Sequence, residues 1–381
     1  MMNTELLTNA DIYAKPFPNF GQPKIIGYIG LENLKYLRTV CNKKVKLDLN
    51  LFVNEVKRKP PDLDVKLNDL INFLSNNEIR LDLGLPNKLE SAAIFCYRGL
   101  MTSVACTPYE NREPWEIVAV LFKGNIYLCK RDTEEKKIEK RHMSEKDKLF
   151  TSWGFKFEQY MLSDKPHIEP NPNMPVDETE EFSLVFKTHL HKHTIIYGAE
   201  MDGIRCDKEE IDVVPESLED AIQYLLDKEF VELKTNRRIE FPNQDRNFRR
   251  FKLKKWWCQS FLVGIETILC GLRNDYGIVE ELKVYKVRDL PKMCQKMWEP
   301  SVCFNFLDTF FTYVKRCLSR EIKLKYGDKA INNLQNLPLT SLLFEWSPGS
   351  SVRVREHYSH EDDPILPEWF LKSYGKSYNL A

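Results

Sequence analysis

Acidic residues that follow apolar, strand-like stretches are the strongest chemical signal in this 381-residue sequence. Glu158 ends a Gly-Phe-Lys-Phe-Glu stretch that we expect to be extended, with its two phenylalanines on the other face. Glu200 and Asp202 come at the end of an apolar run, and Glu232 and Lys234 alternate with apolar residues. Residues two apart in a strand share a face. Each of the last two pairs is therefore expected to point to one side.

Carboxylates in apolar surroundings lose hydration and repel each other. A hard divalent cation relieves both effects, and Mg²⁺ prefers oxygen ligands while keeping several waters. Two such ions can activate a water and hold the leaving oxygen in phosphodiester hydrolysis. Lys234 would then stabilise charge on the scissile phosphate, while Val231 and Leu233 face the core. Asp202 followed by Glu232-Leu233-Lys234 is the D…(D/E)-x-K arrangement of a broad nuclease superfamily.

Composition excludes several classes of protein. Lys and Arg number 56, as do Asp and Glu, so the chain does not bind nucleic acid through its overall charge. The ten cysteines form no C-x-x-C pair, which leaves a zinc ribbon or thioredoxin motif unsupported. No stretch approaches the length of a membrane span, and residues 1–15 lack the apolar core of a secretory signal. We therefore expect an intracellular protein with reduced thiols and no membrane partner.

The remaining patterns predict the elements that position the acids. We expect a hairpin around Lys123-Gly124 and a helix that opens at Ser144 and ends at Gly154. Strands are expected over 182–201 and 230–234, and helices over 63–76, 218–229, 256–272 and 303–318. Residues 166–181, rich in proline and acids, predict a surface loop. The segment after Pro348 is expected to be irregular.

The mixture of strands and helices has no regular βαβ rhythm, and no composition break divides the chain. We expect an α/β (α+β) fold: a single compact domain with mixed β-sheets flanked by helices and a D…(D/E)xK-type nuclease core. Residues 1–22 would form an irregular N-terminal arm and residues 23–350 the nuclease domain. Residues 351–381 would be a C-terminal tail that packs on the domain or trails from it.

A basic segment directly precedes Gln259. Residues 236–257 contain eight basic and two acidic residues, which predicts a phosphate track leading to the site. Interleaved aromatic residues could stack bases, namely Phe241, Phe248, Phe251 and Trp256. The alternative is a solvated basic loop whose aromatic residues anchor it to the core.

Three histidines alternate at positions 189, 191 and 193, so we expect one strand face to carry all of them. That spacing could bind zinc, but no fourth ligand is evident, and a polar strand face is the simpler interpretation. Trp256 and Trp257 are expected in the core. No Ser/His/Asp nucleophile pattern and no glycine-rich phosphate loop is recognisable.

Several motifs occur together in a fixed order. They are G-Φ-x-Φ-E at 154–158, E-x-D at 200–202, E-Φ-K at 232–234 and W-W-x-Q-S-F-L-x-G at 256–264, preceded by Tyr97-Arg98-Gly99 and Cys106-Thr107-Pro108-Tyr109-Glu110. In this order they resemble the decapping exonucleases of the DXO type, which include the fungal partner of the nuclear 5′→3′ exoribonuclease. The resemblance spans roughly residues 16–350.

The resemblance implies hydrolysis at RNA 5′ ends. Such proteins remove incompletely methylated caps, NAD caps or triphosphate-derived groups, and many then degrade the RNA 5′→3′. It implies that Lys234 and Gln259 contact the scissile phosphate and that Arg98 contacts a 5′-proximal phosphate or the cap. The implied ligands of two Mg²⁺ ions, for which Mn²⁺ can substitute, are Glu158, Glu200, Asp202 and Glu232.

The implied partners are RNA 5′ ends that are capped, NAD-capped, triphosphorylated or monophosphorylated. For part of the family a nuclear 5′→3′ exoribonuclease is another partner, and nuclear residence with a cytoplasmic fraction is implied. Two departures are visible: Gly203 stands where many members have cysteine, and residues 205–229 are longer than in vertebrate members. Neither touches an implied ligand. Two alternatives stay open, a catalytically weak RNA-end adaptor for another nuclease or a transcription complex, and a DNA nuclease.

Overall fold

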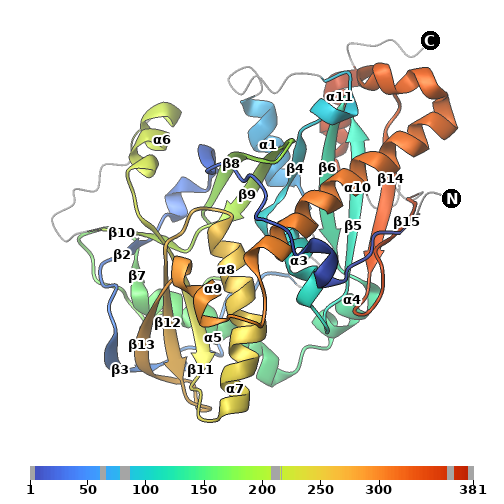
Figure 1. Cartoon of the computed structure of the whole chain (residues 1–381). Coiled ribbons are helices and arrows are strands. Elements are labelled where there is room, and N and C mark those ends of the chain that lie inside the picture. Colours follow the sequence, from blue (N-terminus) through green and yellow to red (C-terminus); the bar gives the residue numbers. More distant parts are fainter. Residues whose placement is uncertain are drawn as a thin grey trace.

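Two mixed β-sheets organise the molecule, one of eight strands and one of seven among the described residues. The computed structural model describes residues 5–60, 66–77, 86–206, 215, 217–357 and 364–375. Figure 1 shows the sheets in the two halves of the molecule with helices packed over them. This arrangement confirms the expected α+β class with mixed sheets. None of the described helices has the length and apolar character needed to cross a membrane.

The eight-stranded sheet contains the predicted hairpin. Phe122 pairs with Asn125 across a two-residue turn, and Lys123 and Gly124 both have positive φ, at 50° and 82°. Positive φ at both central residues is the turn geometry that follows the natural twist of a hairpin. The strand order is β1 (Lys24–Ile29), β8 (Ser183–Leu190), β9 (His193–Glu200), β4 (Ile94–Tyr97), β6 (Asn125–Arg131), β5 (Trp115–Phe122), β14 (Thr340–Trp346) and β15 (Arg353–Glu356).

The seven-stranded sheet begins where the other sheet ends along the chain. Met201 and Asp202 connect β9 in the first sheet to β10 in the second. The strand order is β3 (Lys43–Asp48), β13 (Ile278–Lys286), β12 (Thr267–Arg273), β11 (Phe230–Arg237), β10 (Gly203–Arg205), β2 (Tyr36–Leu37) and β7 (Leu162–Ser163). Residues at this two-residue connection are thus held by both sheets.

Helices cover both faces of each sheet. On the large sheet, α3 (Arg98–Cys106) and α10 (Pro300–Tyr326) pack on one face, and α1 (Asn68–Asn76) and α11 (Glu368–Gly375) pack on the other. On the small sheet, α5 (Glu145–Met161) packs on one face. A π-helical turn (Phe248–Leu253) continued by α8 (Lys254–Phe261) contributes to the core on the other face. The remaining described α-helices are α4 (Glu134–Arg141), α6 (Leu218–Leu226), α7 (Pro242–Asn247) and α9 (Leu290–Met293).

The helix expected to end at Gly154 continues to Met161, so that expectation was wrong. Its predicted start is confirmed, because the Ser144 hydroxyl accepts a hydrogen bond from the Asp147 N–H at 3.1 Å. Glycine inside a helix costs only about 1 kcal/mol relative to alanine. Trp153 and Phe157, four residues apart, pack together into the core beneath the small sheet and outweigh that cost. Glu158 is therefore helical and not extended.

Two further expectations differ from the structure. Residues 256–272 were expected to form one buried helix, but α8 ends at Phe261 and β12 begins at Thr267. Gly264, with φ +73°, turns the chain between them. The segment after Pro348 is not irregular throughout, since β15 pairs with β14 and Phe370 of α11 packs in the core. The boundaries proposed for an arm, a domain and a tail remain predictions.

The other predicted elements are confirmed with shifted ends. Strands β8 and β9 occupy 183–200, and β11 extends beyond the expected 230–234. Helices α6 and α10 match the helices expected over 218–229 and 303–318, and α1 matches the described part of 63–76. Residues 207–214 and 216, within the segment 205–229 that was expected to be longer than in vertebrate members, lie outside the described residues.

Candidate active site

The predicted site residues gather where the two sheets meet. In the large sheet β4 runs parallel to β9, and Tyr97 pairs with Gly198. The carboxyl ends of these neighbouring strands therefore lie at the same edge. Arg98 begins α3 directly after β4, and Glu200 is the last residue of β9. The sequence motifs at 97–99 and 200–202, about a hundred residues apart, are thus neighbours in space.

Strand β11 brings the third motif to the same place. It runs antiparallel to β10, with Gly203 opposite Val231, so Asp202 lies next to Glu232. The Leu233 N–H donates a hydrogen bond of 2.6 Å to the Asp202 carboxylate. Val231 and Leu233 are buried in the core against α5, as predicted. Glu232 and Lys234, which alternate with these buried residues, consequently face the junction between the sheets.

A buried ion-pair network links both sheets at this junction. The Glu232 carboxylate has only 1% of its side-chain surface exposed. Its Oε1 accepts from Lys234 Nζ at 2.5 Å, and its Oε2 accepts from Arg98 Nη1 at 3.3 Å. Removing one member of such a buried network leaves an uncompensated charge, which costs several kcal/mol. Arg98 and Lys234 thus hold the central carboxylate in place.

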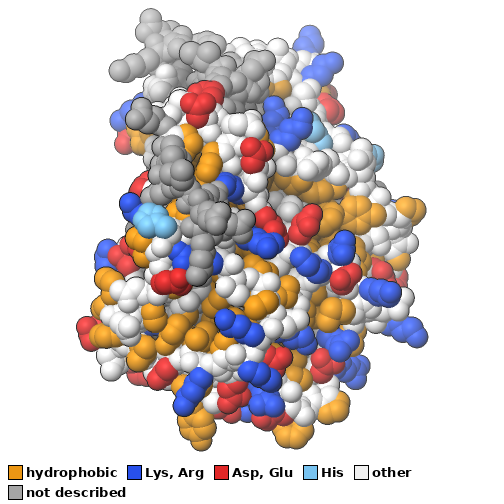
Figure 2. All heavy atoms as spheres, turned by 90° about the vertical axis from the view of Figure 1, so that its left-hand side faces the viewer, with side chains coloured by type: hydrophobic (Ala, Val, Ile, Leu, Met, Phe, Trp, Pro, Cys, Tyr) orange, Lys and Arg blue, Asp and Glu red, His pale blue; other side chains and the backbone are white. Residues whose placement is uncertain are grey.

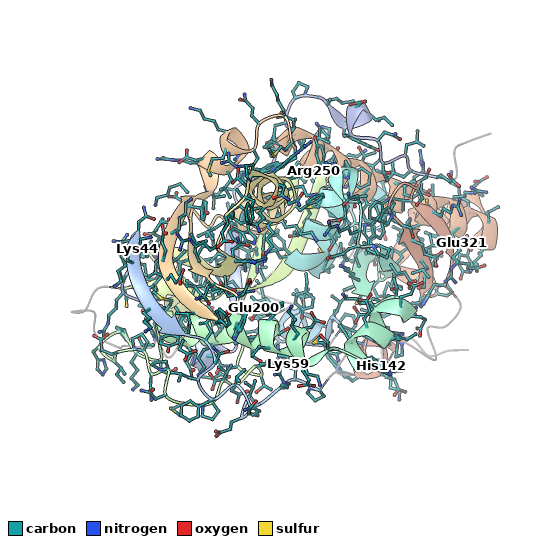
Figure 3. The ribbon with its side chains drawn as sticks, turned by 90° about the horizontal axis from the view of Figure 1, so that it is seen from below. Lys44, Lys59, His142, Glu200, Arg250 and Glu321 are labelled. Carbon is teal, nitrogen blue, oxygen red and sulfur yellow. The ribbon has the colours of Figure 1, made fainter. Side chains whose placement is uncertain are left out.

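Glu158 reaches the junction from α5 because the helix lies unusually close to β12. A Cβ atom on Gly271 of β12 would stand 2.6 Å from the ring of Phe157. Glycine at this position therefore leaves the space that the phenylalanine ring occupies. Glu158, the next residue along the helix, lines a cavity of about 360 Å³ together with Glu200 and Asp202. Figure 3 shows Glu200 in the interior of the projected molecule, between helices and strands of both halves.

Burial and mutual repulsion raise two pKa values at this cavity. Loss of hydration, followed by the charges of Asp202 and Glu200, raises the pKa of Glu158 well above its usual value. Loss of hydration and the charge of Glu232 raise the pKa of Asp202 to about 7. Both carboxyl groups therefore gain from a cation placed between them.

Glu232 and Lys234, in contrast, stabilise each other in their charged forms. Burial alone would raise the pKa of Glu232, but Lys234 and Arg98 outweigh it and hold that pKa below its ordinary value. Burial would lower the pKa of Lys234, but the charges of Glu232 and Asp202 raise it above its ordinary value. Glu232 is thus an anion and Lys234 a cation at neutral pH.

The four carboxylates fit a divalent metal in their chemistry. They offer hard oxygen donors, and the shared repulsion of Glu158 and Asp202 favours binding of a cation. Within the described part of the chain, however, no three His, Cys, Asp or Glu side chains are arranged so that they could hold a metal ion without moving. Glu232 is engaged by Lys234 and Arg98, and Asp202 by a backbone N–H. To bind a metal ion, these carboxylates would therefore have to give up part of their present hydrogen bonds.

Gln259 is half-buried on α8 and is not among the residues that line the 360 Å³ cavity. Its side chain has no hydrogen-bond partner among the described residues, so its amide is available to a ligand. Helix α8 packs against α3, and the sulfur atoms of Cys258 and Cys106 lie 3.7 Å apart at this contact. The Cys258 pKa is raised well above its ordinary value by hydrogen bonds with Cys106 and Cys303 and by burial. A nucleophilic role for that thiol is thus disfavoured.

The basic segment 236–257 is more neutralised than its sequence indicates. Lys254 is fully buried, and its Nζ donates to the Cys106 carbonyl at 3.4 Å. Phe248 and Trp256 are buried and pack with Tyr285, so they are not free to stack bases. The pairs with carboxylates are Arg237–Asp275, Arg238–Glu280, Arg249–Asp245, Lys255–Glu110 and Lys255–Glu113. Only part of the predicted track can therefore meet phosphates without first breaking an ion pair.

The three alternating histidines do not share a strand face, which corrects that expectation. β8 ends at Leu190, His191 occupies the hairpin turn with φ 52°, and β9 begins at His193. His193 is buried and lies 3.1 Å from the Thr312 hydroxyl through its Nε2. A turn between the strands disrupts the two-residue alternation that the sequence suggested.

Sequence reasoning missed the wall of the cavity. Residues 166–181, expected as a surface loop, supply part of its lining, including Met174 and Val176. The buried ammonium of Lys156 holds this loop by donating to the carbonyls of Pro172 and Met174, at 3.0 and 2.9 Å. One feature of the sequence could have indicated this role: Lys156 stands between two phenylalanines in the first motif, and a lysine among apolar neighbours needs hydrogen-bond acceptors. Arg58 and Lys57 add pairs to Glu178 and Asp177.

A strand-borne glutamate and lysine beside an aspartate, together with a helical glutamate, are the parts of a PD-(D/E)XK nuclease, a class of hydrolases. Residues 28–371 match the model described as RAI1-like PD-(D/E)XK nuclease, and the chain belongs to this family. The family membership confirms the resemblance drawn from the motifs.

Relatives resemble the chain over nearly its full length. A Xenopus laevis protein named decapping and exoribonuclease protein is 33% identical over 399 residues, which cover 98% of this chain and 91% of that protein. Two crystal structures share the fold. Scheffersomyces stipitis Rai1 has a TM-score of 0.72 at 21% identity, covering 95% of this chain and 96% of its own. Candida albicans Rai1 has a TM-score of 0.74 at 17% identity, covering 98% and 99%.

Proposed function

We propose that this protein is a divalent-metal-dependent hydrolase of RNA 5′ ends. Its substrates are RNAs with incompletely methylated caps, NAD caps or 5′ triphosphate-derived groups, and 5′→3′ degradation of the RNA follows. The observation that carries the proposal is the buried network of Glu232, Lys234 and Arg98 beside Asp202, at the junction of the two sheets. Mg²⁺ is the proposed ion, Mn²⁺ can replace it, and two ions are bound together.

The relatives support this choice of substrate. The Xenopus laevis protein is named for decapping and exoribonuclease activity. Scheffersomyces stipitis Rai1 was crystallised with (3′-NADP)⁺ and calcium ion, and Candida albicans Rai1 with pU5-Mn²⁺. Such ligands combine nucleotide phosphates with divalent cations, which is the chemistry that the four carboxylates of this chain fit.

Each side chain has a distinct role in the proposed reaction. Glu158, Glu200, Asp202 and Glu232 hold the cations, which supply an activated water and neutralise the leaving oxygen when bound. Lys234 donates to a non-bridging oxygen of the scissile phosphate as negative charge develops there. Gln259 offers an uncharged amide donor to the same phosphate from α8. Arg98, which already bonds Glu232, binds a 5′-proximal phosphate or the cap with its remaining donors.

The test uses four RNAs of one sequence with NAD, unmethylated guanosine cap, triphosphate or monophosphate at the 5′ end. Each is incubated with Mg²⁺, Mn²⁺ or EDTA, and products are resolved by chromatography. The variants are Glu232→Gln and Asp202→Asn, which keep the shape of each side chain. An alanine at 232 would also leave a cavity in the buried site, whereas the glutamine amide keeps an oxygen that can accept from Lys234 or Arg98. Glu219→Gln on the exposed start of α6 is the matched control.

We expect metal-dependent release of a 5′ product by the parent and by Glu219→Gln, and loss of at least 100-fold in both site variants at a temperature where circular dichroism shows each of them folded. Tight RNA binding without any product would instead indicate the adaptor alternative. Cleavage at internal positions of duplex DNA, at rates equal to those on RNA, would indicate the DNA nuclease.

Partner and location are further parts of the proposal. We place the protein in the nucleus with a cytoplasmic fraction, and we propose a 5′→3′ exoribonuclease as its protein partner. Imaging of a tagged chain and co-purification of that nuclease test the two statements separately. A wholly cytoplasmic signal, or purification without the nuclease, would contradict them without affecting the hydrolase assignment.

A further inference from the structure

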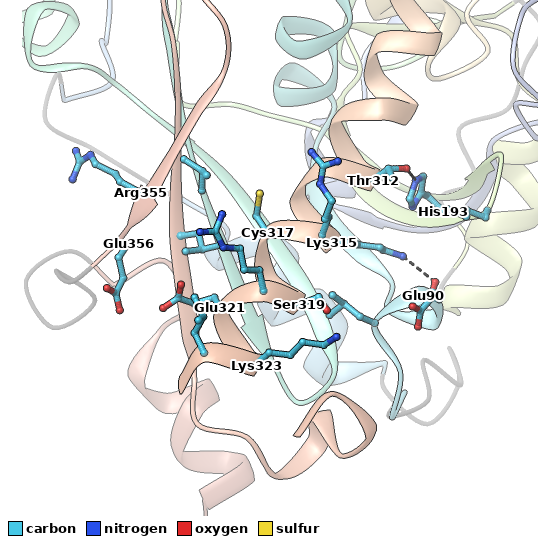
Figure 4. A pocket seen from close by; sticks show the side chains of 17 residues that line it. Glu90, His193, Thr312, Lys315, Cys317, Ser319, Glu321, Lys323, Arg355 and Glu356 are labelled. Atoms are coloured by element: carbon cyan, nitrogen blue, oxygen red, sulfur yellow. Dashed lines mark hydrogen bonds between the residues drawn. The ribbon is translucent and has the colours of Figure 1, made fainter. Parts of the chain in front are cut away.

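A second groove lies away from the carboxylate site. A cavity of about 780 Å³ opens between α10, the strands β14 and β15, and the start of β9, as Figure 4 shows. None of the proposed metal ligands lines it. Figure 3 shows Glu321, one of its lining residues, near the edge of the molecule and far from Glu200. A neighbouring cavity of about 420 Å³ shares Leu89, Glu90 and Ser319 with it, so the groove continues past the first opening.

The floor of the groove is aliphatic. Leu89, Leu342 and Val354 line it, and Leu324 on α10 stands beside them with 71% of its surface exposed. An exposed leucine next to buried aliphatic side chains extends an apolar strip that water covers in the free protein. The strip is accordingly a surface that gains free energy when another apolar surface covers it.

The walls of the groove are fixed by buried hydrogen bonds. Lys315, which is 7% exposed, donates through Nζ to the carbonyls of Glu90 and Ala92 at 3.0 and 2.9 Å. This connection ties α10 to the turn before β4. On the other side His193 Nε2 lies 3.1 Å from the Thr312 hydroxyl. A groove that is formed before binding avoids part of the entropy cost of association.

The rim of the groove is cationic. Arg316 and Arg320 are exposed, four residues apart on one face of α10, and neither has a carboxylate partner among the described residues. Lys192 from the β8–β9 turn adds a third positive charge that pairs with no carboxylate in the part of the chain that the structure describes. Two acids at the rim, Glu321 and Glu356, are already neutralised, because both pair with Lys325. Glu90 also lines both cavities and has no ion pair among the described residues, so the unpaired charge at the rim, three cations against one anion, is positive on balance.

The chemistry of the lining selects the kind of ligand. No Phe, Tyr or Trp side chain lines either cavity, and the imidazole of His193 is fully buried against Thr312, so nucleic-acid bases have no exposed ring on which to stack. The continuity of the two cavities suits an extended ligand better than a single small molecule. We propose that the groove binds an acidic amphipathic segment of a partner protein. Its carboxylates pair with Lys192, Arg316 and Arg320, and its aliphatic side chains cover the leucine floor.

The test measures binding of a defined probe to the full chain by fluorescence anisotropy. The probe is a labelled 16-residue peptide with Leu at helical i, i+3, i+4 and i+7 spacing and Glu or Asp elsewhere. Three control ligands are measured in the same way. In the first peptide Lys replaces the acidic residues, and in the second Ser replaces the leucines. The third control is a 5′-hydroxyl oligouridine. The groove variant is Arg316→Glu with Arg320→Glu. The matched control, Lys43→Glu with Lys46→Glu, reverses the charge of two exposed lysines on β3 in the other sheet.

We expect the acidic peptide to bind the parent and the β3 variant equally, and to bind the groove variant at least tenfold more weakly. Affinity should fall as salt increases, and both peptide controls should bind at least tenfold more weakly than the probe. Hydrolysis of RNA by the groove variant should equal that of the parent. Absence of peptide binding to the parent, or equal binding to the groove variant, overturns the proposal. Oligouridine binding that the groove variant alone loses would also overturn it, in favour of a nucleic-acid site.

Discussion

Lys234 Nζ lies 2.5 Å from Glu232 Oε1, two residues back on the same face of β11. In the resting protein the ammonium therefore neutralises the carboxylate that is proposed to hold a cation. In the proposed reaction, a phosphate that enters the junction would attract Lys234 away from Glu232, and a divalent cation would take the place of the ammonium. Lys234 would then reach the substrate only when a metal ion is bound.

The first prediction concerns Lys234→Met, which removes the ammonium and keeps the length of the side chain. The proposed phosphate contact develops in the transition state, so we expect kcat to fall by about 10²–10³ with little change in KM. The pKa of Glu232 should rise, because only Arg98 then opposes its burial. Single-turnover kinetics on the preferred 5′ end give the measurement. Activity within threefold of the parent would show that Lys234 is structural.

The second prediction concerns the glycine that admits Phe157. Gly271→Ala places a methyl group 2.6 Å from the Phe157 ring, so α5 must shift. We expect a loss of about 1–3 kcal/mol in the free energy of unfolding. Metal affinity should fall with it, since Glu158 follows Phe157. Denaturant unfolding and calorimetry with Mn²⁺ provide the two values.

Gly154→Ala is the control for this experiment. Nothing lies within 4 Å of the added Cβ, and the position is inside α5. This variant should gain roughly 0.5–1 kcal/mol, as alanine is the better helix former. If the two substitutions had the same effect, close packing at Gly271 would not be what positions the helix.

The third prediction concerns acid stability. Burial, with the charges of Lys315 and Lys192, lowers the pKa of His193 to about 3. The unfolded chain then binds a proton below its ordinary pKa of 6.5, while the folded chain does not. Stability is lost as pH falls from 6.5 towards 3, and at pH 5.5 the loss is about 1.4 kcal/mol. Unfolding at pH 7.5 and 5.5 should show this difference in the parent and not in His193→Gln. Equal pH dependence in both proteins would contradict it.

The fourth prediction concerns the wall of the site. Lys156→Met removes the donors that hold the carbonyls of Pro172 and Met174. We expect faster amide hydrogen exchange across residues 166–181 and a several-fold higher KM, with a smaller change in kcat. Lys148→Met, which removes an exposed pair with Glu145 on the same helix, should change neither value. Unaltered exchange in Lys156→Met would mean that the surface ion pairs alone hold the loop.

The sequence predicted where the acids gather because most of them follow apolar strands. The period of two placed Glu232 and Lys234 on one face and the leucine between them in the core, and the structure agrees. The same reasoning failed at Glu158, where two phenylalanines two residues apart suggested a strand. Helical contacts of Trp153 and Phe157 with the sheet determine that segment, and contacts between distant segments are not visible in local spacing.

Charge was the other feature that the sequence could not resolve. The segment 236–257 has a strong local excess of bases, but its neutralising acids come from residues as distant as Glu110 and Glu280. Figure 2 likewise shows basic and acidic side chains interspersed over the face that it presents. Pairing across the fold thus decides which charges stay available to a ligand.

The division of the site between two sheets has a consequence during protein synthesis. Arg98 directly follows β4 and Glu200 ends β9 of the first sheet, while Glu232 and Lys234 lie on β11, whose neighbour β12 ends at Arg273. A nascent chain on the ribosome therefore has no complete site until more than two thirds of it has been made. The proposed hydrolase would thus stay inactive towards RNA for at least the first two thirds of its own synthesis.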